Sequence, residues 1–81
     1  MKTEQEQLAA VKQDAYAIRC IDNPSEVVQF TAVEEDGWAI SFIKNPSKVV
    51  QLEAVKQNGR TIKYIKNPSE AVQLAAKSNI E

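Results

Sequence analysis

The amino-acid sequence predicts an all-α fold: a small, solenoid-like array of about three and a half helix-turn-helix repeats of 22 residues, with about seven helices. The tripeptide Asn-Pro-Ser recurs at positions 23–25, 45–47 and 67–69, at a constant spacing of 22 residues. A glycine interrupts the period near its middle, at Gly37 and Gly59. Apolar residues recur at equivalent positions of successive copies, which is typical of units that bury their apolar faces against one another.

Each copy is expected to contain a longer helix followed by a shorter one. In the central copy, Asn45 is expected to cap the longer helix, and Pro46 fits its first position, where no backbone N–H is needed. That helix should end near Asn58-Gly59, because glycine adopts the left-handed conformation after a helix at little cost. The predicted single domain, 1–81, then divides into copies 1–22, 23–44 and 45–66 and a terminal half-copy 67–81.

The shorter elements admit two interpretations. Residues 61–65 alternate and are rich in β-branched and aromatic residues, so a strand competes with a helix there. The equivalent residues 39–43 alternate less cleanly and residues 15–19 are rich in alanine, which favours helix. The alternative of one continuous amphipathic helix per period is disfavoured by Gly37 and Gly59.

Both ends of the array carry polar replacements. Thr3 and Glu6 have the spacing of a capping box, so the first helix should begin near Thr3. Gln5 and Glu6 replace the apolar pair that later copies carry at 27–28 and 49–50, and Lys77 replaces a recurring valine. We therefore expect a complete array with a polar face at each end.

The predicted core consists of apolar columns that recur with the period. Cys20 is assigned to this core as well, because Phe42 and Tyr64 occupy its place in the later copies. A column of alanines marks where helices approach most closely. The core columns are Leu8, Phe30, Leu52 and Leu74; Val11, Val33 and Val55; Ile18, Ile40 and Ile62; and Ile21, Ile43 and Ile65; the alanines are Ala10, Ala32, Ala54 and Ala76.

Composition disfavours several classes of function. Ten basic residues against eleven acidic ones give a formal net charge of −1, so general nucleic-acid binding is not expected. No apolar run approaches the roughly 20 residues that span a bilayer, so no transmembrane segment is expected. The polar start and single cysteine lead us to expect a cytoplasmic protein.

Catalytic chemistry is also disfavoured. The chain contains no histidine, and therefore lacks the commonest general base and metal ligand. The acidic run Glu34, Glu35 and Asp36 is better explained as a solvated helix end than as a cation site, because consecutive helical residues point in different directions. We therefore expect no enzyme activity, no metal and no cofactor.

Candidate binding residues follow each helix break. Tyr16, Trp38 and Arg60 share one column, and these residue types are the most enriched among interface hot spots. With Glu34 and Glu35 nearby, they form the predicted protein-binding edge, and Trp38 is its anchor. The competing interpretation is that Tyr16 and Trp38 only cover the seam between copies.

The pattern Ala-Val-x-x-x-Gly-x-Ala-Ile-x-Phe at residues 32–42, repeated with Thr61 and Tyr64, resembles the core of a domain-of-unknown-function family of short tandem helical repeats. That family occurs in bacterial, phage and large-virus proteins. The first copy departs from the pattern at Ala15. The resemblance implies a helical array without catalytic residues. It also implies a stand-alone phage or mobile-element protein, of which some bind and block a host protein, for example a defence-system component.

The sequence therefore predicts a non-catalytic protein-interaction module whose partner is another protein, and it leaves a homo-oligomer open. The alternative is a peripheral protein of lipid or membrane surfaces, in which the proline-punctuated amphipathic helices lie on the bilayer.

Overall fold

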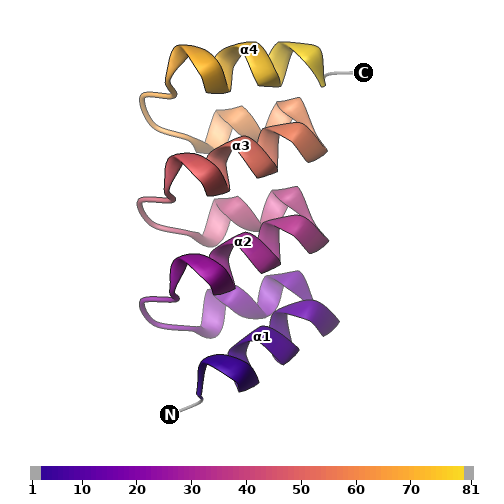
Figure 1. The fold of residues 1–81 in the computed structure, drawn as a ribbon, viewed down its shortest axis with the longest axis vertical. Helices are drawn as coiled ribbons and strands as arrows, with labels where there is room; N and C mark the ends of the chain where they lie inside the picture. The colour runs from indigo at the N-terminus through magenta and orange to yellow at the C-terminus, as the bar shows by residue number, and fades with distance from the viewer. Residues whose placement is uncertain (1–2, 80–81) are drawn as a thin grey trace.

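The computed structural model describes residues 3–79, which contain seven helices and no strand. Four are α-helices and three are 3₁₀ helices, labelled η, and the two kinds alternate along the chain (Figure 1). The predicted all-α repeat array is therefore confirmed. In chain order the helices are α1 (Glu4–Gln13), η1 (Ala15–Cys20), α2 (Glu26–Glu35), η2 (Gly37–Phe42), α3 (Lys48–Gln57), η3 (Gly59–Tyr64) and α4 (Glu70–Ser78).

The helices form two layers. Helices α1 to α4 stack in chain order along the long axis, and η1 to η3 form a second stack behind them (Figure 1). Each α-helix from α2 onward contacts the preceding α-helix and also the 3₁₀ helix of the preceding copy. The array measures 38 × 22 × 15 Å, so it is only two helices thick.

The short elements are helices and not strands. A 3₁₀ helix has three residues per turn, so side chains three apart lie above one another. In η2 and its cap this places Gly37, Ile40 and Ile43 on one side, and all three are buried. The β-branched residues that suggested a strand therefore serve the inner side of a 3₁₀ helix.

The prediction that asparagine caps the longer helices and that Pro46 begins one was wrong. Each of these helices begins two residues later and is capped by serine, as in α3, where the Ser47 hydroxyl accepts from the Val50 N–H at 3.3 Å. Asn23, Asn45 and Asn67 instead have φ of 51°, 50° and 50°. Asparagine tolerates this left-handed conformation better than most residues, and there it turns the chain between layers.

The predicted capping box at the first helix is confirmed. Thr3 is the N-cap of α1, its hydroxyl accepts from the Glu6 N–H at 3.2 Å, and the Glu6 carboxylate accepts from the Thr3 N–H at 2.8 Å.

The prediction of a left-handed glycine at the helix end was also wrong, because no glycine within residues 3–79 has a positive φ. The helices do end where expected, α3 at Gln57 and α2 at Glu35, but each is followed by a C-cap with extended backbone, Asn58 or Asp36. The Asp36 carboxylate accepts from the Trp38 N–H at 3.0 Å. Glycine is needed at 37 for space. A Cβ there would lie 3.0 Å from the Ala54 carbonyl oxygen and 3.1 Å from the Gln57 Cβ.

The core differs from the predicted one in three columns. Val28, Val50 and Val72 are fully buried but were not among the predicted core columns. Leu74 is 58% exposed, whereas Leu8, Phe30 and Leu52 are partly buried against the core. The column of Cys20, Phe42 and Tyr64 is exposed, so Cys20 is not a core residue. The predicted valine column and the close-approach alanines Ala32, Ala54 and Ala76 are buried as expected.

Candidate functional site

Four aromatic side chains lie on the 3₁₀ layer as two edge-to-face pairs, and together we name them the aromatic ridge: Tyr16, Trp38, Phe42 and Tyr64. The rings of Tyr16 and Phe42 meet edge to face, with centroids 5.5 Å apart and planes at 71°. Trp38 and Tyr64 meet in the same way at 5.8 Å and 82°. Each pair joins consecutive 3₁₀ helices, so the ridge crosses all three of them.

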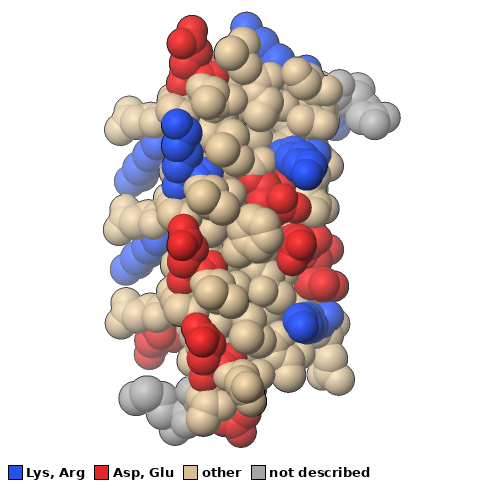
Figure 2. Space-filling model, viewed as in Figure 1, with Lys and Arg blue, Asp and Glu red and all other residues tan. Residues whose placement is uncertain are grey.

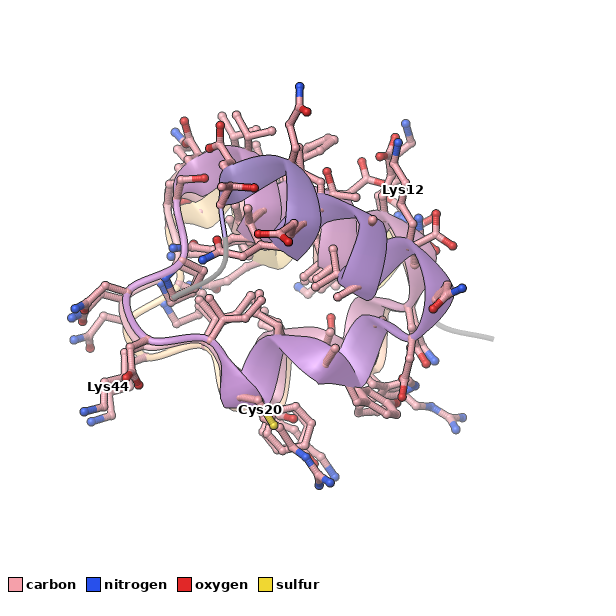
Figure 3. The ribbon with its side chains drawn as sticks, turned by 90° about the horizontal axis from the view of Figure 1, so that it is seen from below. Lys12, Cys20 and Lys44 are labelled. Carbon is pink, nitrogen blue, oxygen red and sulfur yellow. The ribbon has the colours of Figure 1, made fainter. Side chains whose placement is uncertain are left out.

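The ridge faces outward. Phe42 and Tyr64 are 44% and 45% exposed, Tyr16 is 37% exposed, and Trp38 is half-buried. Figure 3 views the array along its stacking axis and shows Cys20 at the outer edge of the 3₁₀ layer. Because Cys20 is the equivalent of Phe42 and Tyr64, its position marks the edge along which the ridge runs.

A lysine extends the ridge with positive charge. The Lys63 Nζ lies 5.7 Å from the Trp38 ring centroid and 5.3 Å from that of Tyr64. At these distances the ammonium interacts with both ring faces, a contact worth about 0.5–1 kcal/mol at an exposed site.

The side chains of Tyr16 and Asp36 interact across the first two copies at the ridge. Hydrogen bonding to Asp36, with smaller contributions from burial and from the charge of Asp36, raises the pKa of Tyr16 above its usual value of 10.0. The same carboxylate accepts from the Trp38 N–H at the start of η2.

The residues predicted from sequence lie along one edge. Tyr16, Trp38 and Arg60 are the second residues of η1, η2 and η3, and the rings of Tyr16 and Trp38 contact Phe42 and Tyr64. Arg60 is exposed where η3 begins. Glu34 and Glu35 are exposed at the end of α2, where the chain passes into η2.

Sequence reasoning missed Phe42, Tyr64 and Lys63 as ridge residues. The first two were assigned to the core on the assumption that the whole apolar column faces inward. The three-residue spacing of Gly59, Ile62 and Ile65 is the signal that could have corrected this. A 3₁₀ helix that turns those residues inward turns position 64 away from the core.

The outer face of the α layer carries a second apolar row. Val27, Val49 and Leu74 are 56%, 55% and 58% exposed. Figure 2 shows acidic and basic groups interspersed along the long axis on this side of the array. Glu26, Lys48 and Glu70 place charges of opposite sign in successive copies, whereas the first copy carries Glu4 at the equivalent position.

Two hollows lie between successive Asn-Pro loops, with volumes of about 570 Å³ and 580 Å³. The first is lined by the end of η3 and the second by the ends of η1 and η2, each together with residues of two successive loops. Tyr64, Lys44 and Lys66 line the first hollow, and Phe42, Lys44 and Asp22 line the second.

Within residues 3–79 no cluster of three potential metal ligands is found. None of the helices in this range has the length and apolarity of a membrane span. Comparison with known proteins found no matching family model, no similar curated protein and no similar solved structure.

Proposed function

We propose that this protein is a non-catalytic protein-interaction module and that the aromatic ridge is its binding surface. The observation that carries the proposal is the exposure of three aromatic rings, Tyr16, Phe42 and Tyr64, from consecutive copies of one scaffold, with the half-buried Trp38 packed against one of them. Aromatic side chains exposed in a contiguous group mark interaction sites, because they bury a large area at little entropic cost. Tyrosine and tryptophan also dominate the hot spots of known interfaces.

The scaffold supports this function because it holds the ridge before a partner arrives. Consecutive 3₁₀ helices pack against one another. Hydrogen bonds also join neighbouring copies: the Gln57 Nε2 of α3 donates to the Glu34 carbonyl of α2 at 3.0 Å, and the Gly59 N–H of η3 donates to the Asn79 carbonyl at the end of α4 at 3.2 Å. Side chains that are already ordered lose less freedom on binding, which favours affinity.

Within this class, the sequence resemblance favours a stand-alone phage or mobile-element protein that binds and blocks a host protein. A protein that blocks a host protein needs a binding surface with affinity for that protein, but it needs no reactive group. The ridge, with Glu34, Glu35 and Arg60 beside it, supplies charged as well as apolar contacts.

The test is affinity capture from the native host lysate with the wild type, Trp38→Ala and Phe42→Ala. Val49→Ala is the matched control, because it removes an exposed apolar side chain from the other layer. We expect both ridge variants to weaken capture of the same protein by about 2 kcal/mol, roughly 30-fold, while the control retains it. A protein captured equally by all variants would place binding elsewhere.

Phe42→Ala is needed beside Trp38→Ala because Phe42 is the more exposed of the two. Its melting temperature should stay close to that of the wild type, so a loss of capture reports binding and not unfolding.

The alternative function is peripheral binding to a lipid surface, and the exposed row of Val27, Val49 and Leu74 favours it. It predicts co-sedimentation with anionic vesicles that Val49→Asp abolishes and Phe42→Ala does not. The interaction-module proposal predicts no sedimentation and no gain of helical circular dichroism on adding the vesicles.

A further inference from the structure

The two layers differ in charge although the whole chain is close to neutral: the 3₁₀ helices with their caps and loops, residues 14–25, 36–47 and 58–69, contain five basic and three acidic residues, a net charge of +2, and the acidic ones belong to the caps and loop of the first two copies. Within residues 3–79, the four α-helices contain seven acidic and four basic residues, a net charge of −3. Residues 37–47 and 59–69, which comprise η2, η3 and the loops after them, contain four basic residues and no acidic one. The basic residues are Lys44, Arg60, Lys63 and Lys66.

This positive charge lies beside the exposed rings. Tyr64 lines one hollow together with Lys44 and Lys66, and Lys44 also lines the neighbouring hollow with Phe42. Figure 3 shows Lys44 extending outward at the loop corner of the array, next to the edge on which Cys20 lies. Lys63 lies over the rings of Trp38 and Tyr64. Ammonium groups therefore flank the later half of the ridge from two sides.

We propose that the partner segment bound by the ridge is an acidic stretch of polypeptide that carries an apolar side chain among its carboxylates. This inference rests on the proposed function and names the chemistry of the partner. The apolar side chain packs against Phe42 and Tyr64, and the carboxylates bind Lys44, Lys66 and Lys63. Such charge complementarity accelerates encounter and selects against basic partners.

A single-stranded nucleic acid fits these observations less well. Its bases bind by stacking on open aromatic faces. Here the Lys63 ammonium lies over the faces of Trp38 and Tyr64, and these two rings also meet edge to face. The net charge of −3 on the α layer would further oppose a long phosphate backbone.

The test begins with selection of short random peptides on the immobilised wild-type protein. We expect enriched peptides to be net negative and to share an apolar residue. The affinity of one enriched peptide is then measured by fluorescence anisotropy for three variants. The double variant Lys44→Glu and Lys66→Glu should weaken binding about tenfold or more. Lys48→Glu makes the same kind of charge change on the α layer and should leave binding unchanged.

Lys44, Lys66 and Lys48 are all exposed, so circular dichroism should report a folded protein in each case. Enriched peptides that are neutral or basic, or that bind the double variant as well as the wild type, would overturn the acidic-segment proposal. If Phe42→Ala still abolished their binding, the proposed function would stand. If no peptide is enriched on the wild-type protein relative to the Phe42→Ala variant, both the acidic-segment proposal and the proposed function are overturned. Tighter binding of a single-stranded oligothymidine than of any enriched peptide would assign the basic side to nucleic acid instead.

Discussion

Replacing either of two adjacent valines in α3 by alanine tests how the α-helices face the core. Val50 is fully buried, whereas Val49 is 55% exposed. The same apolar pair occurs in α2, and the first copy carries Gln5 and Glu6 there. Because the two substitutions remove identical atoms one residue apart, their comparison isolates burial from chemistry.

The expected change in the free energy of unfolding follows from the atoms that each substitution removes and from how deeply those atoms are buried. Val50→Ala removes two buried carbon groups, worth about 0.8 kcal/mol each, and leaves a cavity between helices fixed by their neighbours. We expect a loss of about 2–3 kcal/mol in the free energy of unfolding. Val49→Ala removes half-solvated atoms and replaces valine by a better helix former, so its effect should stay within about 0.5 kcal/mol.

Thermal unfolding followed by circular dichroism at the helical band measures both variants. A domain of this size loses about 4–8 °C in melting temperature per kcal/mol, so Val50→Ala should melt roughly 8–24 °C below the wild type. Val49→Ala should melt within a few degrees of it. Equal drops in melting temperature for the two variants, or a larger drop for Val49→Ala, would refute the orientation of α3 in which Val50 is buried and Val49 is exposed.

Three further outcomes follow from single features of the fold. Gly37→Ala should lower the free energy of unfolding in urea by about 1–2 kcal/mol, because the Ala54 carbonyl lies 3.0 Å from the added Cβ. Asn45→Val should cost about 1–2 kcal/mol in the same assay, since a β-branched residue is strained at a φ of 50°. In a Tyr64→Phe variant Tyr16 is the only tyrosine, and its titration, followed by tyrosinate absorbance, should have its midpoint above pH 10.0. Adding Asp36→Asn to this variant should lower that midpoint. The Tyr16 pKa is raised on folding, so its stabilising contribution is complete below pH 10 and is lost as pH rises through the folded value.

The repeat organisation was predictable because stacking requires equivalent residues at equivalent places. The recurrence of Asn-Pro-Ser at 22 residues therefore predicted the architecture, and the spacing of Thr3 and Glu6 predicted the first helix start. Both inferences depend on local hydrogen bonding and on a constant period. Neither requires knowledge of which way a helix faces.

The helix starts after each Asn-Pro pair could not be predicted in the same way. Asparagine and serine are both good N-caps, and proline fits before or within the first turn. What decides between Asn45 and Ser47 is the reversal of the chain between layers, which requires a left-handed residue. A carbonyl contact reinforces the observed choice, because the Gln51 Nε2 donates to the Pro46 carbonyl at 3.0 Å.

The ridge was half predicted for a related reason. Tyr16 and Trp38 were identified by residue type, but the facing of Phe42 depends on whether its element turns by 100° or 120° per residue. Six-residue elements are too short for a periodicity to distinguish the two. Only the tertiary structure shows that η2 is a 3₁₀ helix and that Phe42 points away from the core.

The same geometry separates the core positions from the proposed binding positions. In η2 the first, third, fourth and seventh positions, Gly37, Ala39, Ile40 and Ile43, are buried. The second and sixth positions supply the ridge, as Trp38 and Phe42 do. Stacking repeats these positions in every copy, and the sixth position is exposed in all three 3₁₀ helices. Under the proposed function, a change of partner would therefore require substitutions mainly at positions outside the core.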